Sequence, residues 1–392
     1  METNETHVDG SWTVEFLKRL VRINSVNPTL VKGAPGEVEI AECVADTMRE
    51  IGLETRLEEV EPGRPNAVGV LKGSSGGPTL MLNGHLDTVG IEYMEIDPLD
   101  PVVKDGRLYG RGANDMKGGL AAILAAAKAV ADSGVQLRGD LLVAAVCDEE
   151  YASIGTERLA EEVKVDAAIF GEPSRLQVVV AHKGFVWMDV ETLGVAAHGS
   201  RPEVGVDAIA KMGKVLVGIE RLQEEVLQRR RHGLVGAPSI HASIIRGGRE
   251  LSTYPDHCKL QVERRLIPGE DADDVEAEMR AMLASISGAD PKFKGSHRIT
   301  FVRGPMEVSP DEEICRILRR STLEVTGAAP EFVGSSGWMD TEIVWKRGTP
   351  AVAFGPRGEG SHAAVEWVEV DSVVDAARIL ELTAARFCGA EA

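Results

Sequence analysis

The sequence is poor in positive charge, in long apolar runs and in cysteines that could pair. It has 392 residues, and 62 acidic against 43 basic side chains give a net charge of −19. That charge disfavours nucleic acid and anionic membranes as partners, because both repel an acidic surface. No apolar run approaches the roughly 20 residues that cross a bilayer, and no apolar segment led by Lys or Arg opens the sequence. We therefore expect a cytoplasmic protein that binds neither nucleic acid nor membranes.

The cysteines are odd in number and lie far apart along the sequence. They are Cys43, Cys147, Cys258, Cys315 and Cys388. A disulfide framework uses an even number of cysteines at regular spacings, mostly in short secreted chains. We therefore expect free thiols in a reducing compartment.

The length and the apolar content are sufficient for two domains. Of the 392 residues 43% are apolar, which supplies a large core. Apolar periodicity and turn residues predict helices over 11–22, 36–51 and 117–131, with extended segments over 54–59, 66–72, 79–83, 141–147, 165–170 and 351–354. Helices alternating with buried extended segments indicate an α/β domain.

The pattern changes near residue 181. From there to residue 301 it reads strand, helix, strand, strand, helix, strand, over 182–192, 206–230, 239–246, 257–266, 271–287 and 297–301. That order is typical of a ferredoxin-like α+β domain. A helix over 310–326 returns the chain to the first domain. We therefore predict an α/β domain over 1–180 and 302–392, with a domain inserted over 181–301.

Residue types that bind metals follow several predicted strands of the first domain. The segments are Gly84-His85-Leu86-Asp87, Asn114-Asp115-Met116, Asp148-Glu149-Glu150, Gly171-Glu172-Pro173 and Ser361-His362-Ala363. Open α/β sheets place their active sites at the carboxyl ends of their strands. Imidazoles beside several carboxylates are typical of divalent-metal hydrolases. Any one of these carboxylates alone would be an ordinary surface residue, but jointly they predict a metal site.

One segment offers a different nucleophile. Gly73-Ser74-Ser75-Gly76-Gly77 formally fits the Gly-x-Ser-x-Gly elbow of serine hydrolases. That elbow requires a strand before it and a helix after it. Because a strand is predicted after it here, we interpret the segment as a flexible hairpin turn.

The metal-binding segments, in this order and over about residues 14–386, resemble the M20 metallopeptidases and amidohydrolases. That family includes acetylornithine deacetylase, succinyl-diaminopimelate desuccinylase, aminoacylase-1 and carboxypeptidase G2. The resemblance implies a zinc-exopeptidase-like mixed sheet that holds two zinc ions, for which cobalt or manganese could substitute. It makes Asp115 the ligand shared by both ions, with His85 and Glu172 on one and Glu150 and His362 on the other. Each ion would have three protein ligands and an open position shared as a bridging water, as in catalytic zinc sites.

Two further acidic residues stand beside the implied ligands. Asp87 follows His85 by two residues, and on an extended segment both would face one side, so its carboxylate is expected to hydrogen-bond the far ring nitrogen of His85. The resemblance makes Glu149 the general base, which takes a proton from the water and returns it to the leaving amine. The adjacent Glu149 and Glu150 can both face the site only if the preceding strand ends at Cys147.

The inserted domain resembles the lid and dimerisation domain of the same family. His198 matches a histidine that crosses to the other subunit's site and supports the developing oxyanion. Arg265 matches an arginine that grips a substrate carboxylate, although the adjacent Arg264 leaves the register open. Ser252 stands where the family often has an asparagine, and a hydroxyl reaches less far than an amide. The resemblance thus implies a homodimer and a small carboxylate-bearing substrate.

These features together predict a dinuclear zinc amidohydrolase that cleaves the amide bond of small N-acyl amino acids. A dipeptidase or carboxypeptidase of the same family, or an N-carbamoyl amino acid hydrolase, would use similar ligands, and the sequence does not separate them. A non-catalytic metal-binding protein is disfavoured, because Glu149 and all the implied ligands are present.

Overall fold

The computed structural model describes residues 6–74 and 76–389, which form two compact units. The first unit comprises the chain up to Val180 together with Val308–Val333 and the chain from Met339 onward. The second unit comprises Ala181–Glu307 and Gly334–Trp338. The short segment Gly334–Trp338 joins the second unit because Trp338 packs against Phe185, with ring centroids 6.1 Å apart. The hydrophobic pattern of the sequence does not predict that this segment belongs to the second unit.

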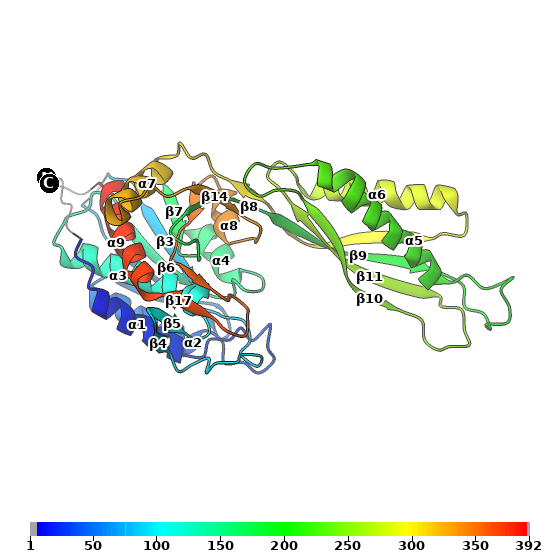
Figure 1. The fold of residues 1–392 in the computed structure, drawn as a ribbon, viewed down its shortest axis with the longest axis horizontal. Helices are drawn as coiled ribbons and strands as arrows, with labels where there is room; N and C mark the ends of the chain where they lie inside the picture. The colour runs from blue at the N-terminus through cyan, green and yellow to red at the C-terminus, as the bar shows by residue number, and fades with distance from the viewer. Residues whose placement is uncertain (1–5, 75, 390–392) are drawn as a thin grey trace. The chain divides into compact units, whose positions relative to one another are not determined.

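The first unit contains most of a mixed sheet of nine strands, of which residues 181–182, 306–307 and 334–335 belong to the second unit (Figure 1). Its strands are β1 (Glu54–Glu61), β2 (Arg64–Leu71), β3 (Leu80–His85), β6 (Leu141–Val146), β7 (Ala167–Phe170), β8 (Val178–His182), β13 (Met306–Glu307), β14 (Phe332–Ser335) and β15 (Ala351–Ala353). The strand order is β1-β2-β6-β3-β7-β15-β8-β13, and β14 pairs with β8. The central strands β6, β3, β7 and β15 run parallel to their neighbours in that group. All of their residues are buried, because helices cover parallel sheets on both faces.

Helices surround this sheet, and short strands form a second, four-stranded sheet. The helices of the first unit are α1 (Gly10–Arg22), α2 (Val38–Ile51), α3 (Gly118–Asp132), α4 (Ile154–Glu162), α7 (Glu313–Thr326), α8 (Thr341–Trp345) and α9 (Val370–Phe387), with a π-helical turn η1 (Ala113–Lys117) before α3. The small sheet has the order β16-β17-β5-β4, from Gly358–Glu359, Trp367–Glu369, Arg107–Tyr109 and Val102–Lys104. The helix α3 is rich in small residues and packs against α9 (Figure 1).

The segment from Gly73 to Gly77 is not a hairpin turn, and that prediction was wrong. Although it links β2 to β3, these strands are not neighbours, because β6 lies between them and pairs with both. A strand follows the segment, as we expected, whereas a serine-hydrolase elbow requires a helix there. Ser75 itself lies outside the described residues.

The second unit has the ferredoxin-like order of elements that the sequence predicts. Its elements are β9 (Gly184–Leu193), α5 (Ala208–Arg221), β10 (Ser239–Gly247), β11 (His257–Leu266), α6 (Ala272–Ala289) and β12 (Gly295–Arg303). The strands form an antiparallel sheet in the order β10-β11-β9-β12, and α5 and α6 cover one of its faces (Figure 1). The predicted helix over 206–230 is shorter than expected. It leaves α-geometry at Leu222 for a π-helical turn η2 (Leu222–Val226) and a 3₁₀ turn η3 (Leu227–Arg229).

No helix within the two described stretches of the chain combines the length and the apolar character needed to span a bilayer.

Candidate metal centre

His85 is the last residue of β3, and its side chain is almost fully buried. Its Nδ1 lies 2.9 Å from the backbone oxygen of Asp87. The carboxylate oxygen Oδ1 of Asp87 lies 3.8 Å from the same nitrogen, beyond hydrogen-bond distance. The expected bond between the Asp87 carboxylate and the His85 ring is therefore wrong. Because β3 ends at His85, Asp87 no longer follows strand geometry, and its backbone carbonyl takes that place.

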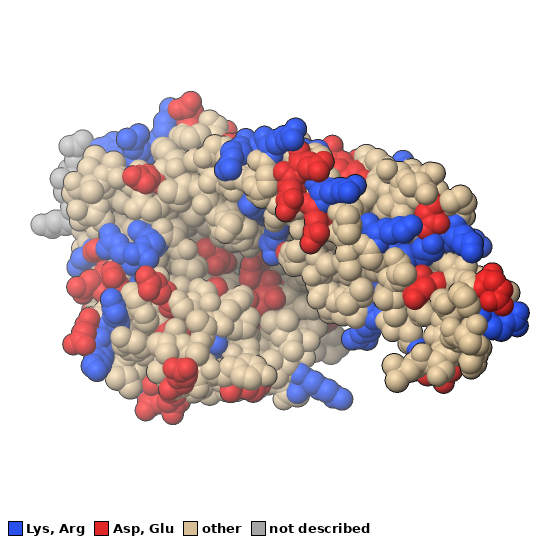
Figure 2. Space-filling view, turned by 45° about the vertical axis from the view of Figure 1, so that its right-hand side comes forward, with Lys and Arg blue, Asp and Glu red and all other residues tan. Residues whose placement is uncertain are grey.

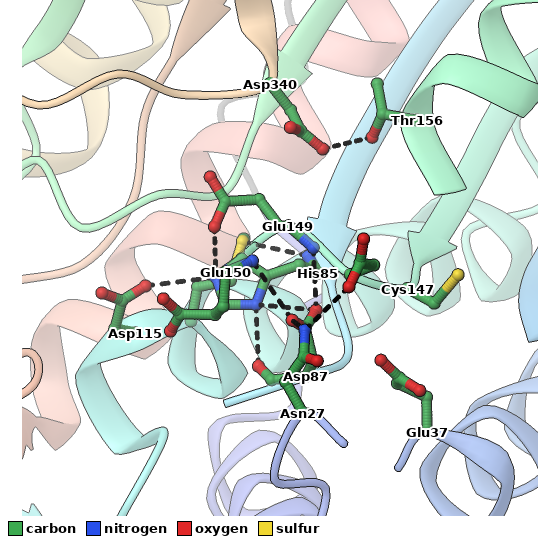
Figure 3. A network of polar contacts seen from close by, with 12 residues as sticks. Asn27, Glu37, His85, Asp87, Asp115, Cys147, Glu149, Glu150, Thr156 and Asp340 are labelled. Atoms are coloured by element: carbon green, nitrogen blue, oxygen red, sulfur yellow. Dashed lines mark hydrogen bonds and ion pairs between the residues drawn. The ribbon is translucent and has the colours of Figure 1, made fainter. Parts of the chain in front are cut away.

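The Asp87 carboxylate holds the turn that carries the two glutamates. It accepts hydrogen bonds from the backbone N–H groups of Glu149 and Glu150, each at 3.1 Å, and from Asn27 Nδ2 at 2.8 Å. Figure 3 shows the Asp87 carboxylate directed at this turn, with Asn27 beside it. The strand β6 ends at Val146, before the acidic residues, so the turn brings both glutamates to the site.

Asp115 lies between the two histidines. It belongs to η1, the π-helical turn that leads into α3. Its Oδ1 is 3.1 Å from His85 Nε2, and its Oδ2 is 3.5 Å from His362 Nε2. Asp115 thus comes from a turn before a helix, rather than from the end of a strand in the large sheet. One carboxylate spans the two halves of the site.

Glu172 reaches the site from the segment after β7, where the backbone passes very close to α3. A Cβ on Gly119 would lie 1.8 Å from the backbone oxygen of Gly171, so only glycine fits at this approach. Glu172 Oε1 lies 3.9 Å from His85 Nε2. The close contact of α3 with Gly171 thus brings Asp115 and Glu172 to one side of His85.

His362 lies in the loop between β16 and β17 and has a left-handed backbone with φ of 61°. Its Nε2 is 2.9 Å from Glu150 Oε2. Its side chain is 54% exposed, whereas that of Glu150 is 5% exposed. This half of the site therefore has one face open to solvent.

The site residues form two groups that share Asp115. His85, Asp115 and Glu172 make the first group, and Asp115, Glu150 and His362 make the second group. In each group one ligand atom from every residue lies within 4.8 Å of the others. This is the grouping that the family resemblance implies. Figure 2 shows acidic side chains set into a hollow in the surface of the first unit.

The centre concentrates negative charge in a buried place. Burial raises the pKa of Glu172 to about 8 and that of Glu150 above its usual range. Burial, with the Glu172 carboxylate next in effect, raises the pKa of Glu149 well above its usual range. Asp115 is the exception, because hydrogen bonding and charge attraction from His85 outweigh the effect of burial and lower its pKa. Cations nearby would therefore favour the ionised form of the three glutamates.

The donor set fits two divalent cations of the zinc type. Each group has one imidazole and two carboxylates, a set that zinc, cobalt and manganese accept. Glu150 Oε1 is buried, and no donor in residues 6–74 and 76–389 reaches it. An orphaned buried carboxylate oxygen is costly unless something else binds it, and a cation in the second group would do so.

Two predicted residues of the second unit, His198 and Ser252, lie on facing segments. The N–H of Gly199 donates to the backbone oxygen of Ser252 at 2.7 Å, and His198 forms an isolated β-bridge with Thr253. Both predicted side chains are exposed, and His198 Nδ1 lies 2.8 Å from the hydroxyl of Ser200. The structure thus places His198 and Ser252 together beyond the end of β9 at Leu193.

The neighbouring arginines of β11 have very different surroundings. Arg264 is completely buried and forms ion pairs with Glu270 and Glu278 at 3.0 and 3.1 Å. Arg265 is 30% exposed, pairs with Glu263 at 2.7 Å and lies over the ring of Phe185. Of the two, only Arg265 has a partly exposed side chain. Which of the two contacts a substrate stays a prediction, and the difference in burial favours Arg265.

Several buried polar residues near the centre were missed by the sequence analysis. Asn27 also donates to Asp148 at 3.0 Å, and Arg64 donates to the same Asp148 oxygen at 2.8 Å. Arg64 in turn forms a bidentate ion pair with Glu37. Asp340 is buried beside Glu149 and adds to the negative charge around it (Figure 3). These residues come from separate segments, and no local motif marks them.

The sequence and the fold are both similar to known proteins. The sequence profile described as Peptidase family M20/M25/M40 matches residues 81–386. An acetylornithine deacetylase of Myxococcus xanthus is 33% identical, covering 85% of this chain and 87% of its own. An N-formyl-4-amino-5-aminomethyl-2-methylpyrimidine deformylase of Bacillus subtilis is 29% identical, covering 86% of each chain. The crystal structure of the aminopeptidase PepT from Bacillus cereus has a TM-score of 0.80 at 19% identity, covering 96% of this chain and 98% of its own.

Proposed function

The chain belongs to peptidase family M20/M25/M40, and we propose that it is a dinuclear zinc amidohydrolase that cleaves small N-acyl amino acids. Membership of the family makes it a hydrolase of amide bonds. The observation that carries the proposal is the pair of three-residue groups that share Asp115. A shared carboxylate with separate ligands on either side is the arrangement needed to hold two cations around one reacting water.

The chain's own residues supply the proton transfers of the reaction. When bound, the two cations would polarise the scissile carbonyl and lower the pKa of the attacking water to roughly 7. Glu149 Oε2 lies 3.9 Å from His85 Nε2, at the edge of the first group, and its side chain is 13% exposed. Glu149 therefore stands where it can accept the water's proton and deliver it to the leaving amine. The Asp87 carboxylate holds the backbone of Glu149 in place for this step.

The spacing within the second unit supports a homodimer in which His198 acts on the partner subunit's site. Arg265 pairs with Phe185 at the start of β9, whereas His198 follows Leu193 at the end of that strand. Eight residues of extended chain separate the two ends by about 26 Å, which is longer than a small acylated amino acid. This separation favours an arrangement in which the two side chains reach one small substrate from different chains. Two chains related by a two-fold axis can do so.

A surface suited to such a dimer lies on the same unit. The strand β10 is an edge of the sheet in the second unit, and Ile244 and Ile245 on it are 47% and 49% exposed. The neighbouring helix α5 exposes Ile209 and Val217 to 44% and 47%. An edge strand with exposed apolar side chains is prone to pair with a second copy across a two-fold axis.

The substrate class is proposed from Arg265 and from the named relatives. A guanidinium with part of its surface open fits the carboxylate of an amino acid. The relatives named above include a deacetylase of an acylated amino acid and a deformylase. Ser252, in the segment facing His198, offers one hydroxyl where a longer amide would reach further. We therefore propose a small acyl group, with the amino acid held by its carboxylate.

A hydrolysis screen tests this function. Purified full-length protein, loaded in turn with Zn²⁺, Co²⁺ and Mn²⁺, is assayed on N-acetyl, N-succinyl, N-formyl and N-carbamoyl amino acids and on dipeptides. We expect metal-dependent release of free amino acid from one N-acyl series. Preferential cleavage of dipeptides would replace the proposal with a dipeptidase or carboxypeptidase. Turnover of the carbamoyl series alone would indicate a carbamoyl hydrolase, and binding of metal without any turnover would indicate a metal-binding protein. A cytoplasmic location is part of the proposal and is tested by cell fractionation.

A further inference from the structure

The buried carboxylate of Glu366 holds the turn that carries Asp115. Its Oε1 accepts the backbone N–H groups of Asn114 and Asp115 at 2.9 and 3.0 Å. Its Oε2 accepts the N–H of Gly112 at 3.0 Å and Nη1 of Arg111 at 2.6 Å. Both oxygens therefore only accept hydrogen bonds, and the side chain is completely buried. Such a fully bonded carboxylate fixes the backbone of the turn in one conformation.

The partner of Glu366 connects this turn to the loop of His362. Arg111 Nη2 donates to the backbone oxygen of Ala363, the residue after His362, at 3.1 Å. Its Nε donates to the backbone oxygen of Gly90 at 3.2 Å. The Arg111 guanidinium thus donates to three different residues through its three nitrogens. One of the acceptors, Ala363, is the neighbour of the predicted metal ligand His362.

A second contact joins the same two segments. Asn114 Nδ2 donates to the hydroxyl of Ser361 at 2.8 Å. The Ser361 hydroxyl also hydrogen-bonds the Asp115 side chain. The turn before α3 and the loop between β16 and β17 are therefore linked on both sides of the Asp115–His362 pair.

We propose that Glu366 is a positioning residue which, together with Arg111, sets the placement of Asp115 relative to His362 and thereby the affinity of the second group for its cation. The inference rests on the proposed dinuclear function and deepens it. Glu366 touches neither ligand side chain, and acts through the backbone of one segment and the guanidinium bound to the other.

The second group depends on this link more than the first does. In the first group His85 ends a buried strand and Glu172 follows another, so the large sheet holds both. In the second group His362 lies on a loop, and its side chain is 54% exposed. Loss of the Glu366 contacts leaves two ligands of the first group in place. In the second group, the same loss frees both Asp115 and the loop that carries His362.

The test is Glu366→Gln, measured by calorimetric titration of the metal-free, full-length protein with Zn²⁺. Glutamine keeps the shape but turns an NH₂ group toward two donors, so either the Asn114 and Asp115 contacts or the Gly112 and Arg111 contacts are lost. Residues that orient metal ligands typically contribute about 10- to 100-fold to metal affinity. We expect the second equivalent of Zn²⁺ to bind about 10- to 100-fold more weakly and the first to stay within about threefold. Equal weakening of both equivalents, or no weakening of either, overturns the inference.

Glu381→Gln is the matched control. Glu381 is also a buried carboxylate of the first unit that accepts a backbone N–H, in this case from His7 at 2.9 Å. Among the residues that the structure describes, its hydrogen bonds go to His7 and not to the metal centre, so both zinc affinities should be unchanged even if the thermal midpoint falls. A loss of second-site affinity in this control would mean that any buried-charge defect produces the effect, which also overturns the inference.

Arg111→Lys answers the same question if Glu366→Gln does not fold. Lysine keeps the charge but cannot bond Glu366, Ala363 and Gly90 together. It should weaken only the second equivalent and alter the absorption bands of Co²⁺ bound there; unchanged affinity and bands overturn the inference. Wild-type protein that binds fewer than two equivalents, or hydrolyses none of the amides, refutes the proposed function instead.

Discussion

The two units hold their candidate functional residues in opposite ways. In the first unit His85, Glu150 and Glu172 are 1%, 5% and 9% exposed in their side chains, with His362 the exception at 54%, and buried carboxylates hold the backbone of the turns nearby. In the second unit His198 and Ser252 are exposed, and Arg265 is partly exposed. The comparison teaches that the chemistry is preorganised within one unit. The proposed substrate contacts would come from side chains that still have surface available for a ligand or for a second chain.

The largest effect should come from the preorganised unit. Glu149→Gln keeps the side-chain volume but removes the base, so we expect turnover to fall about 10²- to 10⁴-fold with both metals retained. Steady-state kinetics and metal analysis of the same sample check this. Glu150→Ala, one residue away, should instead lose metal, because Glu150 belongs to the second group. Near-native turnover by a Glu149→Gln protein holding two metals would contradict the assigned role.

The next effect tests whether the exposed residues need a second chain. His198→Ala should lower kcat by about 10²- to 10³-fold, as expected for loss of one oxyanion donor. Mixing it with the inactive Glu149→Gln protein should restore activity, because a mixed dimer contains one site with both residues intact. With free subunit exchange about half of the dimers are mixed, so recovery should approach about a quarter of wild-type activity. No recovery, despite exchange shown by differently tagged chains, would place His198 outside the partner's site.

A smaller effect separates the two arginines of β11. Arg265→Lys loses the fork that fits a carboxylate, and charge-assisted hydrogen bonds are worth about 1.5–3 kcal/mol, so KM should rise roughly 10- to 100-fold. The rise should be found for carboxylate substrates and not for their amides. Arg264→Lys is the matched control, since Arg264 is fully buried with Glu270 and Glu278. It should lower the urea midpoint and leave KM unchanged. Equal effects of Arg265→Lys on both substrate forms would make that residue structural.

The smallest effect is a difference in response to acid. Burial favours the neutral form of Glu270, but hydrogen bonds from Arg264 and Arg230 outweigh it and hold its pKa below the usual range. A lowered pKa contributes stability above the unfolded value of about 4.3. That contribution is lost as pH falls through the folded pKa. Urea unfolding between pH 3 and 6 should therefore show a loss of stability on acidification that Glu270→Gln reduces. An identical pH dependence in the variant would show that the pair adds nothing.

Much of the architecture could be predicted from local pattern. The alternation of elements over 182–301 predicted the ferredoxin-like order of the second unit, because the hydrophobic period changes from strand to helix at each boundary. Errors occurred where geometry depends on contacts distant in sequence. The strand β6, from beyond α3, lies between β2 and β3. The helix α5 changes to π-geometry at Leu222, and we find no local signal for that change.

The order and chemical type of the functional groups can be read from the sequence alone. Six residues, His85, Asp115, Glu149, Glu150, Glu172 and His362, already specified a divalent-metal hydrolase, because ligand types and the ends of apolar runs are local properties. The contacts that hold these groups in place become visible in the folded chain. The tertiary structure assigned the Asp87 carboxylate to the backbone of Glu149 and Glu150, and it distinguished Arg264 from Arg265 by burial. It also brought Glu366 to a turn about 250 residues earlier. Such contacts depend on which buried donors remain to be satisfied once the chain has folded, and no local pattern records that.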